Sequence, residues 1–334
     1  MKINREDLLV QLESVRSGLA TREIIEQSSC FVFQDGLVHT FNDEILCSQP
    51  CSLHIEGAVQ GKPLLSILQK LPGTNISITT EKNKLVITDK KRRATIRMES
   101  KILLPMDAVK IGTKWEKIST TFSEAIRWVG DSAGTDETQF LTTCIHLHPD
   151  YIEACDNFRA ARYKIKIPVR KPTVVRKSSI FPIIYLGMNK LAESKKWISF
   201  QNANGLILSC RRFFDPFEDL TELFKVKGSS IALPKNIGEA VERAHVFSAE
   251  NAEDDDIVIH LQPNQLSIKG TGAFGSYVEV KKAEYSGKSR KFLIPPQLLI
   301  DIVGKNNNVK ISKKRLKLTV GKFTFVSALT KVKK

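Results

Sequence analysis

The chain has 334 residues, of which 51 are lysine or arginine and 36 are aspartate or glutamate, giving a formal charge of +15. Apolar residues make up 42% and charged residues 26%, a composition typical of globular rather than disordered chains. The length exceeds what one hydrophobic core usually serves, which predicts two or three domains. The basic balance favours a polyanionic partner, either nucleic acid or an acidic membrane surface.

Several other classes are excluded by the same pass along the chain. No apolar run approaches the roughly 20 residues that span a bilayer, which excludes an integral membrane protein. The start, MKINREDLLVQLESV, is charged and amphipathic rather than an apolar signal core, so we expect a cytoplasmic protein. The cysteines are scattered without a CxxC pair, which predicts free thiols rather than a disulfide framework or a zinc site. We expect no cofactor and no bound metal.

Amphipathic helices are predicted at three comparable points along the chain. In the first, Leu8, Leu12 and Val15 recur at helical spacing, and Leu9 widens the apolar face. The same spacing recurs later, which indicates that one helix type is used repeatedly. The apolar sets of the second and third helices are Phe122, Ala125, Ile126 and Val129, and Ile237, Ala240, Val241 and Ala244.

A second type of segment begins with proline. The stretch PLLSILQKLPGTNISITTEKNKLVIT starts at Pro63, and PQLLIDIVGKNNNVKISKKRLKLTV starts 233 residues later at Pro296, with no gap needed. Each predicts a proline-started helix, a short turn and two strands. A middle copy starts at Pro182, with a slightly longer turn. The offset carries Ile76 onto Val309, Ile78 onto Ile311 and Leu85 onto Leu318.

Strands outside these segments repeat as well. Residues 259–268 (IHLQPNQLSI) match residues 145–154 (IHLHPDYIEA) 114 residues earlier. The unit is therefore helix, strands, helix, strands, which predicts an α+β fold with antiparallel sheets packed on one face under the helices. We expect three repeated domains, at residues 1–110, 111–225 and 226–334.

The order and spacing of several segments resemble one known family. MKINREDLLVQLESVRSGLATR, KPLLSILQKLPGTNISI, IEACDNFRAAR and YSGKSRKFLIPPQLLIDIV are similar, in that order, to segments of the bacterial-type DNA sliding clamp, the beta subunit of DNA polymerase III. The resemblance covers nearly the whole chain. It implies the DNA clamp fold, with two chains paired head to tail in a ring whose helices line the hole. It also implies a non-enzymatic processivity factor that meets phosphates without reading sequence.

The resemblance implies a set of DNA-binding residues. Arg22 matches the arginine after the family's first helix, and Gln139 and Phe140 fall on a middle-domain loop that contacts DNA in the family. Other cations lie on or beside the predicted lining helices. They are Lys62, Lys70, Arg127, Lys190, Arg243 and Lys305.

A partner-peptide groove is also implied, between the middle and last domains. At two places the chain departs from the family pattern: Asn157-Phe158 replaces Gly-His, and Ser327-Ala328 replaces Met-Pro. We therefore expect an altered peptide specificity, while the alternative that Phe158 and Leu329 are interdomain core stays open. The implied groove residues are Cys155, Asn157, Phe158, Arg159, Ala160, Pro216, Leu220, Ser327, Ala328 and Leu329.

Ring closure is expected at an edge strand of the first domain. The resemblance places Ala94 and Ile96 on that strand and Val246 and Phe247 opposite them, in the third domain of the partner subunit. An unpaired edge is a liability that pairing across a dimer removes. Because Ala94 is small, a weaker closure is predicted.

The implied partners are double-stranded DNA, a DNA polymerase and a clamp loader, the two proteins binding through short linear peptides. The apparent shortness of the chain and its altered groove favour a phage-encoded member. The tail, residues 330–334, is more basic than the family pattern.

Two alternatives remain. The first is a basic nucleic-acid-binding scaffold with this fold but no ring. The second is a metal-dependent nucleic-acid enzyme, because Cys144, His146 and His148 alternate along one strand and could face one metal ion. The third domain lacks an equivalent cluster, which disfavours that reading. The acidic run at 253–256 lacks calcium-loop spacing and is interpreted as a solvated connection.

Overall fold

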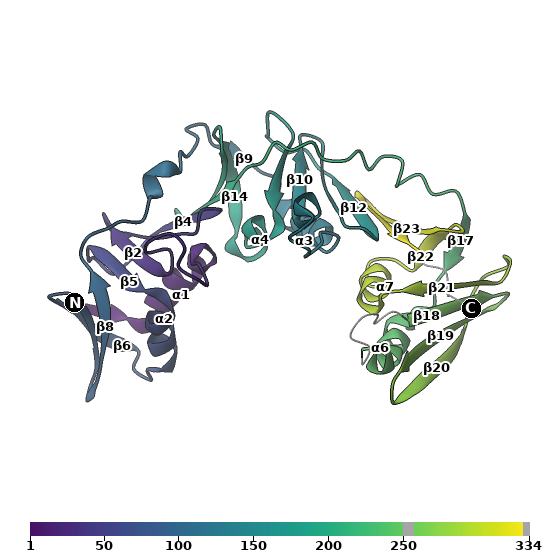
Figure 1. Ribbon diagram of the computed structural model, residues 1–334, viewed down its shortest axis with the longest axis horizontal. Coiled ribbons are helices and arrows are strands. Elements are labelled where there is room, and N and C mark those ends of the chain that lie inside the picture. The colour runs from purple at the N-terminus through teal and green to yellow at the C-terminus, as the bar shows by residue number, and fades with distance from the viewer. Residues whose placement is uncertain (250–256, 330–334) are drawn as a thin grey trace. The chain divides into compact units, whose positions relative to one another are not determined.

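The computed structural model describes residues 1–249 and 257–329 (Figure 1). The acidic run at 253–256 and the basic tail at 330–334 lie outside the described residues. The chain divides into two compact units. Unit 1 comprises Met1–Gly130, Cys144–Tyr151 and Ile165–Pro216, and unit 2 comprises Asp131–Thr143, Ile152–Lys164 and Phe217–Lys334.

Two of the three predicted domains each fall within one of these units, and the middle one is divided between them. Residues 1–110 fall in unit 1 and residues 226–334 in unit 2, while the stretch 111–225 contributes to both. The three-domain boundaries therefore stay a prediction. The α+β fold class, with helices against antiparallel sheets, is confirmed in each unit.

One antiparallel sheet runs through unit 1. Its strands are β1 (Lys2–Asn4), β2 (Cys30–Gln34), β3 (Leu37–Phe41), β4 (Ile45–Pro50), β5 (Gly57–Gln60), β6 (Asn75–Glu81), β7 (Lys84–Asp89), β8 (Arg92–Glu99), β9 (Glu116–Lys117), β14 (Met188–Glu193), β15 (Trp197–Asn202) and β16 (Ile207–Arg211). Their order is β1-β6-β7-β8-β5-β2-β3-β4-β16-β15-β14-β9. The pairing of β4 with β16 joins the first predicted domain to the middle one.

Helices α1 (Arg5–Ser14), α2 (Gly61–Lys70) and α3 (Phe122–Gly130) belong to unit 1. The side chain of Asn4 caps α1 by accepting the backbone N–H groups of Glu6 and Asp7. The predicted apolar faces of α1 and α3 are largely buried, as expected for helices packed on a sheet. Strand β10 (Cys144–His148) pairs with β13 (Thr173–Arg176) in the same unit.

The proline-started repeat is confirmed in its first and last copies. Helix α2 is followed by β6 and β7, and α7 (Pro296–Val303) by β22 (Asn308–Ile311) and β23 (Arg315–Val320). Ile76 and Val309, matched by the sequence offset, are both buried on the first strand after the helix.

The middle copy was predicted wrongly. Pro182 is the N-cap of a helix, but that helix, α5 (Ile183–Leu186), has only one turn and follows another short helix, α4 (Lys177–Ile180). Gly187 adopts a left-handed conformation with φ 63° and ends α5, and β14 follows directly. Lys190, expected on or beside a lining helix, lies instead on β14, where it pairs with Lys117.

Two sheets shape unit 2. Their strands are β11 (Tyr151–Cys155), β12 (Arg159–Lys164), β17 (Ser229–Ala232), β18 (Ile257–Gln262), β19 (Gln265–Gly272), β20 (Gly275–Lys282), β21 (Arg290–Ile294), β22, β23 and β24 (Phe323–Ala328). One sheet contains the run β11-β12-β24-β23-β22-β17, and the other has the order β20-β19-β18-β21.

Helix α6 (Ile237–Ser248) packs against α7 and lies on β19 and β20 of the second sheet. The approach is close at Gly270 on β19. A Cβ atom there would lie 1.8 Å from the carbonyl oxygen of Ala244, so only glycine lets the helix sit at this distance.

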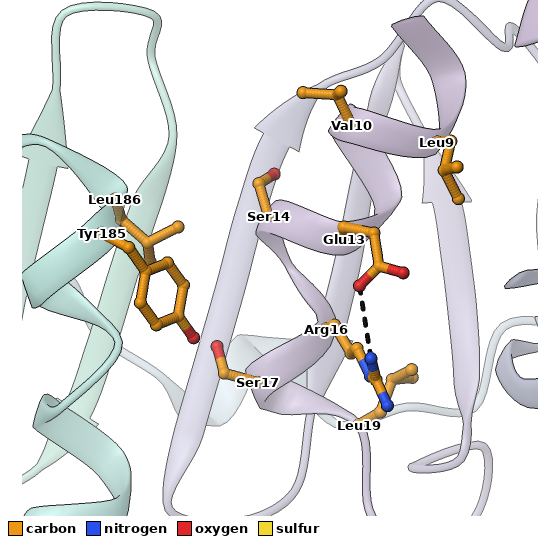
Figure 2. A pocket seen from close by; sticks show the side chains of 9 residues that line it. All are labelled: Leu9, Val10, Glu13, Ser14, Arg16, Ser17, Leu19, Tyr185 and Leu186. Carbon is orange, nitrogen blue, oxygen red and sulfur yellow. Dashed lines mark hydrogen bonds and ion pairs between the residues drawn. The ribbon is translucent and has the colours of Figure 1, made fainter. Parts of the chain in front are cut away.

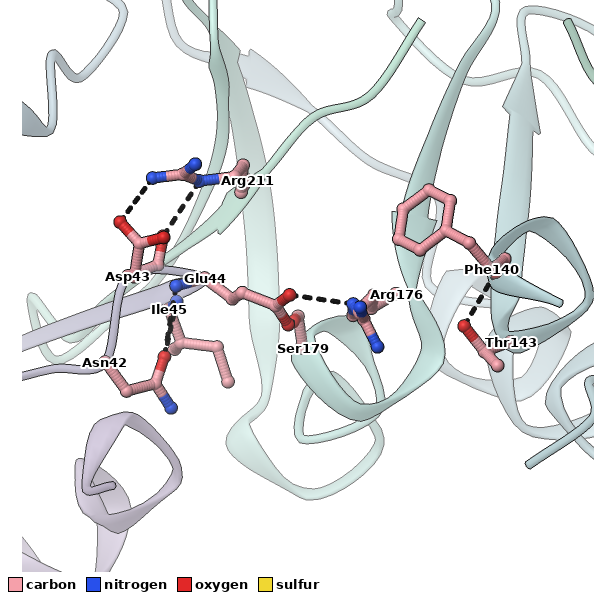
Figure 3. Close-up of polar contacts among 9 residues, drawn as sticks. All are labelled: Asn42, Asp43, Glu44, Ile45, Phe140, Thr143, Arg176, Ser179 and Arg211. Atoms are coloured by element: carbon pink, nitrogen blue, oxygen red, sulfur yellow. Dashed lines mark hydrogen bonds and ion pairs between the residues drawn. The ribbon is translucent and has the colours of Figure 1, made fainter. Parts of the chain in front are cut away.

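Polar contacts reinforce the β4–β16 junction inside unit 1 (Figure 3). Arg176 Nε lies 2.7 Å from Glu44 Oε1, and Arg211 binds both the carboxylate and the backbone carbonyl of Asp43. The Asn42 side chain accepts the backbone N–H of Ile45 at 2.9 Å and holds the turn that presents these acids. Residues from the first and middle predicted domains are thus held together by both backbone and side-chain contacts.

A buried ion pair offers a test of packing in unit 1. Arg212 and Glu193 lie 2.7 Å apart with side chains only 6% and 10% exposed. Arg212→Ala leaves the buried carboxylate of Glu193 without its ion-pair partner and should lower the free energy of unfolding by about 3 kcal/mol. Urea unfolding followed by the fluorescence of buried Trp197 measures this.

The matched control is Lys114→Ala, which breaks an ion pair of 3.0 Å whose side chains are 70% and 42% exposed. It should change the free energy of unfolding by less than about 1 kcal/mol. Equal effects of the two substitutions would contradict the assignment of Arg212 to a buried pair.

Candidate nucleic-acid and peptide-binding sites

Cations lie on the outward faces of the unit 1 helices. Lys62 and Lys70 are exposed on α2, and Arg127 is exposed on α3. Each helix buries its apolar face against the sheet, so the charged residues occupy the remaining face. The structure therefore leaves these predicted DNA-binding residues accessible to a polyanion.

Arg22 lies in the exposed connection after α1, beside a hollow of about 690 Å³ between that connection and α2. The hollow is lined in part by Arg16, Thr21, Lys62 and Gln69. In the described part of the chain, the Arg22 side chain has no partner. Arg16 is already paired with Glu13 at 3.4 Å and Glu23 also lines the hollow, so Lys62 is the lining cation best placed to bind a phosphate group.

Gln139 and Phe140 lie on a structured loop of unit 2. Asp136 accepts the backbone N–H of Thr138 at 3.0 Å and the side-chain amide of Gln139 at 3.2 Å. The Thr143 hydroxyl donates to the carbonyl of Phe140 at 2.7 Å (Figure 3). Gln139 is exposed and Phe140 is half-buried, so the loop presents the amide more than the ring.

The remaining predicted cations are less available. Arg243 on α6 binds Glu279 at 2.9 Å, donates to the Tyr277 hydroxyl at 3.0 Å and lies 3.9 Å from Glu239. Hydrogen bonds from Lys281, Tyr277 and Arg243 lower the pKa of Glu279 to about 2, so this carboxylate stays charged. Lys305, in the turn after α7, lies over the ring of Phe323 at 5.7 Å.

The sequence did not point to an apolar pocket of about 780 Å³ in unit 1 (Figure 2). It lies between α1 and the end of α5, where Tyr185 is 67% exposed and Val10 is 68% exposed. Glu13 and Arg16 form an ion pair of 3.4 Å at its side. Its walls come from segments about 170 residues apart, so no local pattern could have revealed it.

The predicted groove residues of unit 2 start at a tight turn between β11 and β12. Asp156 accepts the backbone N–H groups of Phe158 and Arg159, both at 2.8 Å, and the Arg159 Nε at 2.9 Å. The turn pushes Phe158 outward, where it is 61% exposed, beside exposed Asn157. Its carbonyl accepts the Ala328 N–H at 2.6 Å, which joins the turn to the end of β24.

Behind this turn lies a compact apolar cluster. Ala160, Leu220, Phe224 and Val326 form its buried centre, with Leu220 fully buried. Its half-buried rim is formed by Cys155, Phe217, Leu223 and Val226. We call these residues the apolar cluster. Residues 217–226 therefore pack directly over β12 and β24.

The other predicted groove residues differ in how far their side chains are exposed to solvent. Pro216 is exposed, Ser327 is buried on β24, and Ala328 is exposed. Leu329 is half-buried, and its N–H donates to the carbonyl of Lys314 at 2.8 Å. Phe158 and the cluster rim thus carry most of the accessible apolar surface.

Basic side chains hold the 217–226 segment. Arg162 lies 2.7 Å from Glu153 and 5.0 Å over the ring of Phe224. Lys317 donates to the carbonyl of Phe224 at 2.8 Å. These contacts fix the 217–226 segment in place, so the apolar surface of the cluster is formed before a partner binds.

No protein-family model and no curated protein sequence matches this chain. Its structure is similar to a sliding clamp (DNA polymerase III subunit beta) from Pseudomonas aeruginosa bound to griselimycin, with a TM-score of 0.80 and 16% identity over 99% of both chains. A griselimycin-bound clamp from Bartonella birtlesii gives a TM-score of 0.84 and 15% identity, again over 99% of both chains. The beta subunit from Thermotoga maritima gives 0.80 and 14%, with the same coverage.

The chain has the sliding-clamp fold. Sequence identity of 14–16% explains why only the order and spacing of segments carried the resemblance. Because the alignments span 99% of those chains, length gives no ground for a phage origin, which stays a prediction.

Each unit of this clamp fold has a strand with an open edge. Strand β8 pairs along its length with β7, but with β5 only at Met98 and Glu99. Ala94 and Ile96 lie on β8, half-buried and buried, respectively. Within residues 1–249 and 257–329, the rest of that edge has no strand partner.

The second open edge is β20, which pairs only with β19 among the described strands. Val278 and Val280 are 56% and 59% exposed on it, and Phe274 in the preceding turn is 89% exposed. Sequence reasoning missed these residues, because valines alternating with Glu279 and Lys281 predict an ordinary strand whose valines face the core. The predicted contacts on α6 lie nearby: Val246 is 64% exposed, and Phe247 stacks on Tyr277 at 6.3 Å.

Cys144 and His148, from the strand considered for a metal site, make packing and hydrogen-bond contacts within the protein. Cys144 is buried, and the His148 ring stacks on Tyr151 at 4.2 Å. The Nδ1 of His148 accepts the backbone N–H of Asp150 at 3.2 Å. In the described part of the chain, no group of three His, Cys, Asp or Glu side chains could hold a metal ion, and no helix is long and apolar enough to span a bilayer.

The thiol of Cys155 tests the electrostatics of the cluster rim. Burial, with the charges of Glu218, Glu153 and Asp156, raises the pKa of Cys155 to about 12. Because the thiolate is the reactive form, iodoacetamide should modify Cys155 at pH 8 at least about 50-fold more slowly than it modifies N-acetylcysteine. Mass spectrometry of the digested protein measures the rate.

The rate at Cys155 should rise about tenfold per pH unit from 7 to 9.5, because the thiolate fraction grows this way below the pKa. Removing the Glu218 charge with Glu218→Gln lowers the pKa and should accelerate alkylation. A rate that levels off near pH 9 in the unsubstituted protein would contradict the raised pKa.

Proposed function

We propose that this chain is a DNA sliding clamp: a non-enzymatic, ring-forming processivity factor that encircles duplex DNA and tethers a DNA polymerase. The observation that carries the proposal is the match to bacterial clamps over 99% of the chain, at TM-scores of 0.80 to 0.84. The proposal implies three domains, at residues 1–110, 111–225 and 226–334, and a cytoplasmic location.

DNA contacts in this proposal are electrostatic. The formal charge of +15 and the exposed cations of α2 and α3 favour phosphates, while no base-reading element is needed. Arg22, Lys62, Lys70 and Arg127 are the strongest candidates because they are exposed. Arg243 contributes less in this scheme, since Glu279 already neutralises it.

Ring closure in this proposal joins the β8 edge of one chain to the β20 edge of a second. Two unpaired edges on one chain favour a head-to-tail contact, which closes when two copies meet. Ala94 and Ile96 would then face Val246, Phe247, Val278 and Val280 of the second chain. Burying the exposed valines would add apolar area to the backbone pairing.

The apolar cluster and Phe158 form the partner site in this proposal, and a polymerase and a clamp loader would bind it through short peptides. Two similar clamps are bound to griselimycin, which supports a ligand-binding surface on this fold. Because Asn157 and Phe158 replace the family's Gly-His, we infer a peptide specificity different from that of those clamps.

The ring is tested by solution mass. Multi-angle light scattering at micromolar concentration should give twice the 37.5 kDa chain mass. Val278→Lys with Val280→Lys places charges in the contact and should reduce the mass to one chain, whereas Val10→Lys, at an equally exposed valine of α1, should leave the dimer intact.

The dimer should also be retained on circular DNA and released when that DNA is cut to a linear form. A mass of one chain at every concentration would overturn the closed ring and favour the basic scaffold. Retention on circular DNA that survives linearisation would argue for ordinary binding rather than encirclement.

DNA binding is tested by salt dependence. The triple substitution Arg22→Ala, Lys62→Ala and Lys70→Ala should reduce the slope of log affinity against log salt by up to about 3, since each lost phosphate contact contributes roughly 0.9. Anisotropy of a labelled duplex between 25 and 200 mM NaCl measures the slope. Lys114, Lys195 and Lys196, exposed in loops, provide the charge-matched triple control, and equal slopes for both triples would contradict the assignment.

A further inference from the structure

A row of side chains crosses the unit 2 sheet on the same face as the apolar cluster. The strand register pairs Ser230 with Lys310, Lys310 with Lys317, Lys317 with Val326, and Val326 with Ala160. Directly paired residues of an antiparallel sheet point to the same side. The row therefore leads from the buried centre of the apolar cluster to two lysines.

These two lysines lie directly opposite each other, an arrangement that costs stability in a sheet unless an anion lies between them. Lys164 on β12 adds a third cation on this side. Burial, with the charges of Lys310 and Lys164, lowers the pKa of Lys317. Throughout residues 1–249 and 257–329, none of the three has a carboxylate partner.

The nearby carboxylates are engaged elsewhere. Glu153 pairs with Arg162 at 2.7 Å, and Asp156 with Arg159 at 2.9 Å. On the 217–226 segment, Glu222 binds Lys225 and Asp219 accepts the backbone N–H of Thr221 at 2.9 Å. The remaining acid of the segment, Glu218, acts on Cys155 at the cluster rim, whereas the charges that act on Lys317 are those of Lys310 and Lys164, so the segment leaves the lysine row without a carboxylate partner.

A polar pocket of about 290 Å³ opens at the same lysines. Besides Lys310 and Lys317, its lining includes Ser230, Asn308 and Thr319, all of which carry hydrogen-bonding side chains. These groups can donate to a carboxylate, and no acidic residue lines the pocket in the described part of the chain. The pocket is suited to an anionic group.

The distance from the pocket to the apolar cluster suits one continuous peptide. Neighbouring strands lie about 4.8 Å apart, so Lys310 on β22 is about 10 Å from Val326 on β24. An extended chain advances about 3.3 Å per residue, so about three residues cover this span. Lys317 also touches the cluster directly, through its hydrogen bond to the Phe224 carbonyl.

We propose that Lys310 and Lys317, with Lys164 beside them, bind the carboxylates of an acidic stretch in partner peptides whose apolar residues contact Phe158 and the apolar cluster. The inference rests on the proposed function, because it deepens the peptide site of a clamp. The apolar residues supply most of the affinity, and the acidic residues, about three to five positions away, select the partner.

A peptide fits this surface better than a nucleic acid does. The lysine row adjoins apolar side chains, which match an apolar anchor but not a phosphate backbone. Single-stranded nucleic acids rely on aromatic side chains for stacking, and the described lining of the pocket contains none. The positive charge beside apolar side chains therefore favours an acidic peptide over a nucleic acid as the partner of this surface.

The experiment starts from a random library of 16-residue peptides displayed on phage and selected on the full-length protein. We expect enriched peptides to carry Asp or Glu about three to five positions from a Leu or Phe anchor. The same selection on Lys310→Gln/Lys317→Gln should keep the anchor and lose the acidic enrichment. Lys195→Gln/Lys196→Gln, a charge-matched change at exposed loop lysines, should select the same acidic peptides as the unsubstituted protein.

Anisotropy of one selected, labelled peptide then measures the coupling. The lysine double variant, or replacing the acidic residues of the peptide by amides, should weaken binding about 3- to 10-fold, and combining the two changes should add little. Lys310→Arg/Lys317→Arg should restore binding. Thermal melting verifies folding, and removing the opposed charges should not lower the melting temperature.

Each other outcome overturns the proposal in a distinct way. Anchor peptides without acidic enrichment would refute the lysine site but keep the groove. Failure to select any peptide would refute both the lysine site and the peptide-binding part of the proposed function. If the lysine double variant lost affinity for labelled oligo-dT but not for peptide, the surface would be a nucleic-acid interface.

Discussion

The structure depends on one packing constraint: helices bury their apolar sides against the sheet of unit 1 and against the β20-β19-β18-β21 sheet of unit 2. In unit 1 the buried faces of α1 and α3 leave mainly polar or charged residues facing outward, with Val10 an exposed apolar exception, and in unit 2 Gly270 lets α6 approach the β19 backbone closely. The exposed cations of α2 and α3 follow from this division, because they lie on the helix faces that point away from the sheet.

Open strand edges are the second consequence of the same architecture. Strand β20 ends its sheet, and β8, although it lies between β7 and β5, is paired with β5 only at Met98 and Glu99, which leaves the rest of that edge open among the described strands. Natural sheets usually protect such edges with charges or bulges. Here β20 carries exposed Val278 and Val280 between its charged residues, which argues that the edge is kept for a partner. Its inner face is held rigid by Arg243 and Glu279.

The repeat could be predicted wherever helix and strands keep their spacing without a gap. Ile76 and Val309 were matched correctly because a helix of ordinary length precedes each strand. The middle copy failed because Gly187 ends α5 early and converts the expected helix around Lys190 into a strand. The open β20 edge, the apolar pocket beside Tyr185 and the lysine row depend on contacts between distant segments, which periodicity in one sequence does not reveal.

The altered groove and the lysine row have a common physical interpretation. Exposed Phe158, raised by the Asp156 turn, enlarges an apolar surface that many peptides could contact with similar affinity. Apolar contact alone discriminates poorly, because it is non-directional and grows with area. The opposed lysines, Lys317 in contact with the cluster and Lys310 about 10 Å from Val326, add a penalty for peptides that leave them uncompensated and a gain for those with a carboxylate at the right spacing. Selectivity at this site would then come from charge placement rather than from a closer apolar fit.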